Sequence, residues 1–484
     1  MPVNSTSNIE PWIIDLWEWA DKFEIPEKDL PRNKEDLLAI TDLDIGSNQL
    51  TELPESIGNL VNLTKLDITG NLIAKIPESI GKLIKLTTLY GLHNQFTELP
   101  ESIGQLTNLK SLDVSYGKVT KLPESIGQLR ELDWLRADCC DLTELPENIG
   151  NLIHLTNLSV AFNHLTELPE SIGQLVNLSE LNIRSNQLAR LPESIGQLVN
   201  VENLFADCND LTELPESIGQ MTNLVWLRVR QNKLSKLPNS IGQLGNLRTL
   251  DLGEEGAIQG IHHTSRKMDS DSLTYRANQL TDLPDSISKL INLNFLNVRG
   301  NLFNHLPKNI FHLSNLRYLD ISDNQITELP ECIGQLEKLE CLGINENKLS
   351  KLPQSIFNLV SLTELSMGTN NLTELPSDIG QLTNLEQLSF YKNNIHELPE
   401  SIGELVKLES LNLSDNYIIT LPNSICKMTN LEWIVINDVF TKSPNRNHIK
   451  LINLSDKVTS FLEGLEDGCV GLNYDPTNDE DGTV

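Results

Sequence analysis

The stretch LSELNIRSNQLARLPESIGQL, residues 178–198, specifies the architecture of this 484-residue chain. Apolar and polar residues alternate over residues 181–183, and a two-residue period predicts a short β-strand with one buried face. Asn186 follows, and its side chain both donates and accepts hydrogen bonds, so it can satisfy backbone groups where the chain turns. The segment 191–198 returns Leu, Ile and Leu to the core, and its Pro and Gly predict 3₁₀ or extended coil rather than a full α-helix.

The pattern LxxLxLxxNxLxxLPxxIxxL recurs with a period of 23 residues. The position of Asn186 is repeated at 48, 71, 94, 117, 140, 163, 209, 232, 255, 278, 301, 324, 347, 370, 393, 416 and 439, which gives eighteen repeats over residues 40–439. Cys140 can replace the asparagine as a small, weakly donating group. Gly117 has no side chain, so we expect the asparagine ladder to weaken at the fourth repeat.

Stacked repeats of this kind predict an α/β solenoid that is curved, with one continuous parallel sheet on the concave face. Short 3₁₀ or extended coil is expected on the convex face. Such a stack exposes apolar ends that need caps, and we assign residues 1–39 and 440–484 to them, the second including an acidic tail. A membrane-surface helix is disfavoured for the first cap because its polar face is acidic. Its apolar residues fall at helical spacing: Ile13, Leu16, Trp17, Ala20 and Phe23.

One repeat, at about 253–277, has lost its LPxxI half. The 23-residue register survives, and Leu273, Tyr275 and Asn278 still occupy strand and ladder positions. We therefore favour a degenerate repeat that keeps its strand and has a protease-sensitive segment at residues 254–269. A looped-out insertion of matching length is the alternative.

Composition and charge exclude several classes of function. A formal net charge of −30 repels nucleic acid and anionic membranes, so neither is expected as a partner. The chain has no apolar run long enough to span a bilayer, and its first residues do not resemble a secretory signal peptide. Seven scattered cysteines fit free thiols in a reducing cytoplasm.

The sequence contains no recognisable catalytic, metal or cofactor motif. Phosphate-binding loops, nucleophile elbows and zinc-ligand spacings are all missing. His262 and His263 have no third ligand nearby, and Cys139 has no neighbouring histidine to activate it. Glu55, Glu101 and their repeat equivalents form a solvated face. We expect a protein without enzymatic activity or cofactor.

The variable outward positions of the strands carry the candidate binding site. Most are small or polar, but the middle repeats present aromatic and arginine side chains, which are enriched at interface hot spots. Surface variation stabilised by cross-strand pairs is the alternative, and Asp138, Asp207 and Asp251 could cancel part of the charge. The candidate partner-binding residues are Trp134, Arg136, Phe162, Arg184, Phe205, Trp226, Arg228, Arg230, Arg276, Phe295, Arg299 and Tyr318.

The run LTELPESIGQLxNL resembles the 23-residue, LPxxIG-bearing intracellular repeats of Ras-suppressor-type proteins and of many bacterial leucine-rich-repeat proteins. The resemblance covers residues 40–439 and implies a scaffold or adaptor that binds a protein on its concave face, such as a small GTPase. The arginines suggest an acidic protein segment as partner. An exported bacterial effector that binds host proteins is the alternative. A GTPase-associated or ubiquitin-ligase enzyme is disfavoured because only about 45 residues follow the last repeat.

Overall fold

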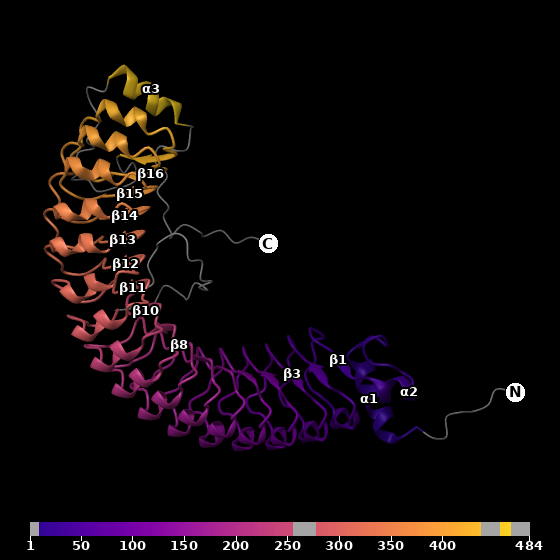
Figure 1. Ribbon diagram of the computed structural model, residues 1–484. Coiled ribbons are helices and arrows are strands. Elements are labelled where there is room, and N and C mark those ends of the chain that lie inside the picture. Colours follow the sequence, from indigo (N-terminus) through magenta and orange to yellow (C-terminus); the bar gives the residue numbers. More distant parts are fainter. Residues whose placement is uncertain (1–8, 255–276, 437–454, 466–484) are drawn as a thin grey trace, which may run out of the picture. The chain divides into compact units, whose positions relative to one another are not determined.

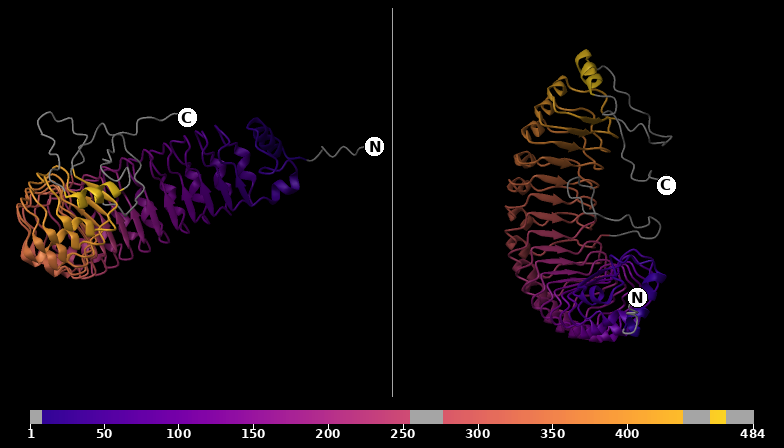
Figure 2. Two further views of the ribbon diagram at one scale, coloured as in Figure 1. Left: turned by 90° about the horizontal axis from the view of Figure 1, so that it is seen from above. Right: turned by 90° about the vertical axis from the view of Figure 1, so that its right-hand side faces the viewer.

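The computed structural model describes residues 9–254, 277–436 and 455–465. The chain divides into two compact units, residues 1–247 and 248–484. In each unit a three-residue strand is followed, on the opposite side of the coil, by a five-residue 3₁₀ helix, except after the last strand (433–435), where the described range ends at residue 436 (Figures 1 and 2). Apart from three α-helices, all helices in the described ranges are 3₁₀, as the LPxxI segment predicted.

Residues 1–247 form a parallel sheet whose strands pair in chain order with a register of 23 residues, so that Leu181 lies beside Leu204. The strands are β1 (Asp42–Asp44), β2 (Lys65–Asp67), β3 (Thr88–Tyr90), β4 (Ser111–Asp113), β5 (Trp134–Arg136), β6 (Asn157–Ser159), β7 (Glu180–Asn182), β8 (Asn203–Phe205) and β9 (Trp226–Arg228). The 3₁₀ helices are η1 (Glu55–Asn59), η2 (Glu78–Lys82), η3 (Glu101–Gln105), η4 (Glu124–Gln128), η5 (Glu147–Asn151), η6 (Glu170–Gln174), η7 (Glu193–Gln197), η8 (Glu216–Gln220) and η9 (Asn239–Gln243).

Residues 248–484 repeat the same arrangement. The strands are β10 (Thr249–Asp251), β11 (Phe295–Asn297), β12 (Tyr318–Asp320), β13 (Cys341–Gly343), β14 (Glu364–Ser366), β15 (Gln387–Ser389), β16 (Ser410–Asn412) and β17 (Trp433–Val435). The 3₁₀ helices are η10 (Asp285–Lys289), η11 (Lys308–His312), η12 (Glu331–Gln335), η13 (Gln354–Asn358), η14 (Ser377–Gln381), η15 (Glu400–Glu404) and η16 (Asn423–Lys427). In both units the middle residue of each strand is buried, and it packs with the Leu and Ile of the 3₁₀ segment.

The eighteen-repeat count is wrong by one, because β10 pairs directly with β11. Thr249 lies beside Phe295, a register of 46 residues, so β10 and β11 are direct neighbours with no strand between them. Asn301 donates to the carbonyl of Leu252, 49 residues earlier, where a regular ladder asparagine reaches back 26. The favoured degenerate repeat is therefore corrected to the alternative, an insertion one repeat long between Glu254 and Asn278. The protease-sensitive segment and the packing of Leu273 and Tyr275 lie outside the described residues.

A ladder of buried asparagines joins each coil to the next. Nδ2 of Asn186 donates to the carbonyls of Val160 and Ile183 at 3.0 and 3.1 Å, and its Oδ1 accepts from the Leu165 N–H at 3.0 Å. Cys140 does replace the asparagine as a donor, since its Sγ lies 3.4 Å from the carbonyl oxygen of Val114. The amide thus connects two coils through groups that water cannot reach.

We expect Asn186→Ala to lower the free energy of unfolding by about 1–3 kcal/mol, because three buried backbone groups lose their partner. The measurement is urea unfolding followed by circular dichroism. Gln187→Ala, which truncates the exposed neighbouring side chain, is the matched control. A loss for Asn186→Ala no larger than that of the control would contradict the ladder's role.

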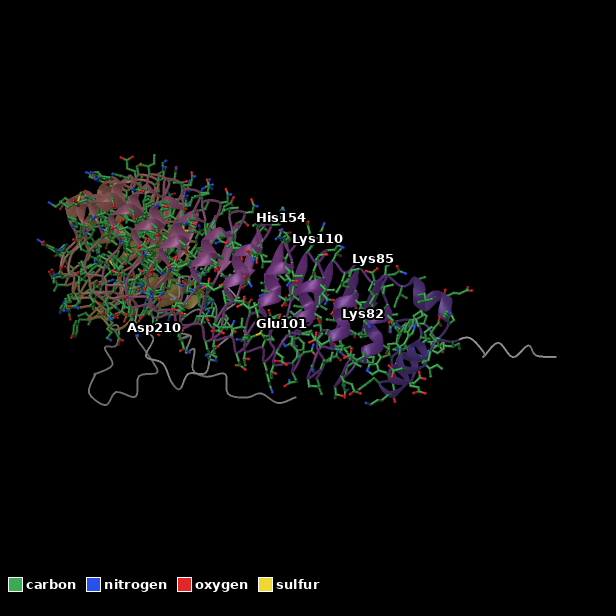
Figure 3. The ribbon with its side chains drawn as sticks, turned by 90° about the horizontal axis from the view of Figure 1, so that it is seen from below. Lys82, Lys85, Glu101, Lys110, His154 and Asp210 are labelled. Carbon is green, nitrogen blue, oxygen red and sulfur yellow. The ribbon has the colours of Figure 1, made fainter. Side chains whose placement is uncertain are left out.

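The glutamates of the ESIG segments link neighbouring 3₁₀ helices, although we expected only a solvated face. Oε2 of Glu101 accepts from the Ser125 N–H at 3.2 Å, and the same contact recurs 24 residues apart along both units (Figure 3 shows Glu101). The helices approach closely, since a Cβ added at Gly196 would lie 2.4 Å from the carbonyl oxygen of Ser217. The glutamates that make this contact therefore cap the N-terminus of the next 3₁₀ helix.

These contacts predict acid sensitivity. The hydroxyl and N–H of Ser240 hold the pKa of Glu216 below its usual 4.5. A lowered pKa in the folded state adds stability above pH 4.5, and this stability is lost as the pH falls through the folded value. We expect Glu216→Gln to lower the unfolding temperature at pH 7 and to differ progressively less from the wild type below pH 4.5. Thermal unfolding across pH tests this, with Glu213→Gln as a charge-matched control; an unchanging difference would contradict it.

Helices cover the first coil and pack on the last 3₁₀ helix. α1 (Pro11–Lys22) begins at a proline and buries four residues, while α2 (Lys34–Ala39) is capped by Asn33. The indole N–H of Trp19 donates to the carbonyl of Glu52 at 3.1 Å. α3 (Asp456–Gly464) packs on η16, and the Ser455 hydroxyl accepts from the Val458 N–H. No helix in the described ranges is long and apolar enough to cross a membrane.

Candidate binding site on the strand face

Each coil contributes the first and third residues of its strand to the strand face. One buried residue follows the strand, and the two residues after it complete the face. In the regular coils outside the insertion, the residue before the ladder asparagine adopts a left-handed conformation, with φ between 50° and 57° in the non-glycine cases. This turn presents its side chain beside those of the strand. The variable residues therefore lie together on a rigid backbone.

Eleven of the twelve expected binding residues lie on this face, but they divide between the units. Arg276 lies outside the described residues. Phe295, Arg299 and Tyr318 belong to residues 248–484. The other eight form the aromatic–arginine patch of residues 1–247: Trp134, Arg136, Phe162, Arg184, Phe205, Trp226, Arg228 and Arg230.

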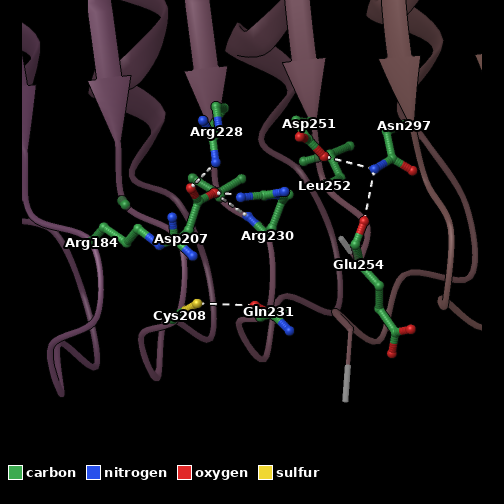
Figure 4. Close-up of polar contacts among 12 residues, drawn as sticks. Arg184, Asp207, Cys208, Arg228, Arg230, Gln231, Asp251, Leu252, Glu254 and Asn297 are labelled. Atoms are coloured by element: carbon green, nitrogen blue, oxygen red, sulfur yellow. Dashed lines mark hydrogen bonds and ion pairs between the residues drawn. The ribbon is translucent and has the colours of Figure 1, made fainter. Parts of the chain in front are cut away.

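Asp207 pairs with two arginines of the patch. Its carboxylate is fully buried, with Nη2 of Arg228 at 2.8 Å and Nε of Arg230 at 3.4 Å (Figure 4). The backbone N–H of Arg230 also donates to Oδ1 of Asp207, at 3.0 Å. The side chains of Arg228 and Arg230 are only 11% and 8% exposed, so both are part of the fold.

Asp138 has the same role three repeats earlier, in the coil of β5. Nε of Arg136 lies 2.5 Å from its Oδ2, while its Oδ1 accepts from the Ser159 hydroxyl at 2.6 Å and the Ala161 N–H at 2.8 Å. One buried carboxylate thus orders an arginine and the next coil. Its burial is stabilised because it is both paired and hydrogen-bonded.

Arginines also cover two of the aromatic rings. The guanidinium carbon of Arg184 lies 5.5 Å from the ring centre of Phe162, and that of Arg228 lies 5.4 Å from Phe205. These are cation–π distances. The phenylalanines are consequently half-buried within the patch.

The side-chain surface of the patch that remains exposed to a partner is therefore mostly that of the two tryptophans. Trp226 is 37% exposed, and Trp134 is half-buried. Arg136, Arg228 and Arg230 are already paired, which corrects the expectation that their charges await an acidic partner. The charge cancellation by Asp138 and Asp207, anticipated as possible, is extensive.

The expected residues of the second unit form separate contacts. Phe295 and Tyr318 stack with ring centres 4.2 Å apart and planes 6° from parallel. Arg299 pairs with Glu346 at 3.2 Å. Burial and the carboxylates around it raise the pKa of Tyr318, so its hydroxyl stays protonated.

A second asparagine column was missed from the sequence. Nδ2 of Asn177 donates to the carbonyl of Ile153, and Nδ2 of Asn200 to that of Val176, both at 2.7 Å. The asparagine that recurs before many of the strands, mostly in an NL dipeptide, was the available signal. These exposed amides fix the rim of the coils at which the strand face begins.

Neither metal nor thiol chemistry is favoured by the described side chains. Within the described ranges no group of three His, Cys, Asp or Glu residues could hold a metal ion. Burial raises the pKa of Cys140 and of Cys341 to about 11, which keeps both as unreactive thiols at neutral pH. His262 and His263 lie outside the described residues.

We expect Asp207→Asn to lower the free energy of unfolding by about 3–5 kcal/mol, because two buried arginines lose their counter-ion. Asp210→Asn is the matched control: Asp210 pairs with Lys233 at 2.6 Å, but both side chains are about half exposed. An exposed pair contributes at most about 1 kcal/mol. Urea unfolding of both variants tests this prediction. Equal losses in the free energy of unfolding would show that Asp207 has no special role.

Residues 90–164, 146–224 and 308–394 match the model of a leucine-rich repeat region, and residues 62–83 and 407–428 match that of a single leucine-rich repeat. Coils of a parallel strand and a 3₁₀ turn, joined by an asparagine ladder, define the class of repeat solenoids. The chain belongs to the leucine-rich-repeat family. No curated protein sequence matches it significantly.

Solved structures agree with this assignment. A leucine-rich-repeat protein of Leptospira interrogans is 34% identical, with a TM-score of 0.72, and the match covers 83% of this chain and 98% of that one. The plant peptide hormone receptor RGFR1, solved in complex with RGF2, is 27% identical with a TM-score of 0.65, over 83% of this chain and 68% of the receptor. The receptor kinase GASSHO1 of Arabidopsis thaliana, in complex with CASPARIAN STRIP INTEGRITY FACTOR 2, is 29% identical with a TM-score of 0.68, over 90% of this chain and 52% of the receptor.

Proposed function

We propose that the protein is a non-catalytic scaffold that binds a partner protein on the strand face of residues 1–247. The observation that carries the proposal is the partly exposed Trp226 beside arginines that buried carboxylates hold in place. Tryptophan is the residue type most enriched among interface hot spots, and a fixed backbone reduces the entropy lost on binding.

The aromatic–arginine patch is well suited to desolvation. Arg136 pairs with Asp138, and Arg228 and Arg230 share Asp207, so these arginines are held in place and partly compensated within the fold. Trp134 and Trp226 share the first position of β5 and β9, separated by four strand spacings of about 4.8 Å each, or roughly 19 Å. Two anchors at this distance fit an extended peptide or one edge of a domain.

The relatives support a polypeptide partner. RGFR1 and GASSHO1 are described in complexes with RGF2 and CASPARIAN STRIP INTEGRITY FACTOR 2, and both resemble this chain over most of its length. A small GTPase, the partner suggested by the resemblance to Ras-suppressor-type repeats, remains within this proposal. The class of partner is a protein surface that presents apolar side chains.

We expect Trp226→Ala to weaken partner binding by about 2 kcal/mol or more, roughly thirtyfold, with no loss of thermal stability. The partner is first captured from a lysate of the source organism with the full chain and identified by mass spectrometry, and its affinity is then measured by calorimetry. Trp433→Ala is the matched control, since Trp433 is 42% exposed at the same position of β17. A larger effect for Trp433 would place the site elsewhere.

We propose a cytoplasmic location. The six described cysteines are free thiols, which fits a reducing compartment. Export as an effector that binds host proteins differs in location and not in binding chemistry. Immunodetection of the protein in cell and culture fractions separates the two: recovery mainly outside the cell would overturn the cytoplasmic location.

A further inference from the structure

Arg184 differs from the other arginines of the aromatic–arginine patch because it has no acidic partner. The other three pair with Asp138 or Asp207. Arg184 forms no ion pair with any carboxylate of the described ranges. Its Nε is buried and has no hydrogen-bond partner among the described residues. A guanidinium in this state retains its capacity to bind an anion.

The equivalent arginine two repeats later shows why Arg184 is unpaired. Arg230 occupies the same position in its coil, and the coil before it supplies Asp207 at the matching position. Oδ1 of Asp207 accepts from the backbone N–H of Arg230 at 3.0 Å and lies 3.4 Å from its Nε. The coil before Arg184 supplies Ala161 at that position, whose side chain has no acceptor. Arg184 therefore lacks the carboxylate that the same position has two coils later.

Asp207 follows Arg184 in the next coil but is already engaged. Its Oδ2 lies 2.8 Å from Nη2 of Arg228, and its Oδ1 pairs with Arg230. Figure 4 shows the Arg184 side chain extending toward Asp207 and Cys208, with no ion pair to Asp207. Because two other arginines share this carboxylate, it does not balance the charge of Arg184.

The guanidinium of Arg184 is nevertheless held in place. Its carbon lies 5.5 Å from the ring centre of Phe162, a cation–π distance. The thiol of Cys208 lies near it, since the positive charge of Arg184 counteracts the rise that burial causes in the pKa of Cys208. Arg184, Phe162 and Cys208 are all partly exposed. A partner can therefore approach a guanidinium whose position is already set by an aromatic ring.

We propose that Arg184 binds a carboxylate of the partner protein, from an Asp or Glu side chain, beside the apolar group that covers Trp226. The proposal rests on the proposed function as a protein-binding scaffold and names the chemistry of a second contact in the same site. A guanidinium matches a carboxylate because its N–H groups can donate in parallel to both oxygens. The acidic partner expected from the arginines of the sequence thus narrows to one contact.

The spacing of the two contacts suits one short segment of a partner. Arg184 lies in the coil of β7 and Trp226 in that of β9. Two strand spacings of about 4.8 Å separate these coils, or roughly 10 Å. A few residues of extended chain cover this distance, at about 3.3 Å per residue.

The test selects phage-displayed random dodecapeptides on the full chain and retains those that lose affinity for the Trp226→Ala variant. We expect the retained sequences to be enriched in Asp or Glu near an apolar residue. The tightest of them is synthesised with a fluorescein label and measured by fluorescence anisotropy. Arg184→Gln should weaken its binding by about tenfold or more. The unfolding temperature should not change, because the substitution breaks no ion pair.

Arg190→Gln is the charge-matched control, since Arg190 is an exposed arginine of the same repeat. Equal weakening by both variants would reveal unspecific attraction of an acidic peptide and overturn the proposal. Replacing the acidic residue of the peptide by its amide should abolish the difference between wild type and Arg184→Gln; a difference that persists would also overturn it.

The two proposals fail in different ways. Peptides that require Trp226 but bind the Arg184→Gln variant undiminished would overturn the carboxylate contact and leave the proposed binding site standing. If no selected peptide requires Trp226, both the binding site and the carboxylate contact are overturned.

Discussion

The structure depends on hydrogen bonds between groups 21 to 26 residues apart, of which the asparagine ladder is the most buried. A three-residue strand has too few backbone bonds to be stable alone, and a coil of 23 residues cannot bury its own core. The amide of each ladder asparagine satisfies carbonyls of its own coil and the preceding one, together with N–H groups of the preceding coil. The exposed asparagines of the rim and the glutamates before the 3₁₀ helices add parallel connections. Order in one coil therefore requires order in the next.

The repeated positions were predictable from the sequence, because their chemistry is the same in every coil. The strands, the 3₁₀ turns, the substitution at Cys140 and the N-cap at Ser455 all follow from local residue types. The insertion between Glu254 and Asn278 was misinterpreted because its length equals one repeat. Periodicity cannot distinguish an added coil from an added loop of that length. Only the pairing of β10 with β11 separates the two.

The sequence predicted where the variable residues lie, but not which of them are paired and buried. Sequence spacing puts Arg228 and Trp226 on the outward face, and the structure does so too. Sequence spacing does not reveal that Arg228 reaches Asp207 of the preceding coil and becomes nearly buried. Such pairing depends on side-chain length and on which of several outward neighbours lies closest. The same limitation hid the pairing of Arg136 with Asp138.

The insertion point shows where this architecture tolerates additional chain. Glu254 and Ala277 lie side by side, with the Ala277 N–H 3.3 Å from Oε1 of Glu254, so the chain leaves and re-enters the coil at nearly one point. The strand before this point and the 3₁₀ helix after it keep the geometry of a regular repeat. The turn next to the ladder asparagine is therefore a site that tolerates inserted residues. Peptide tags, or whole domains with adjacent termini, could be accommodated there without disturbing the stacked core.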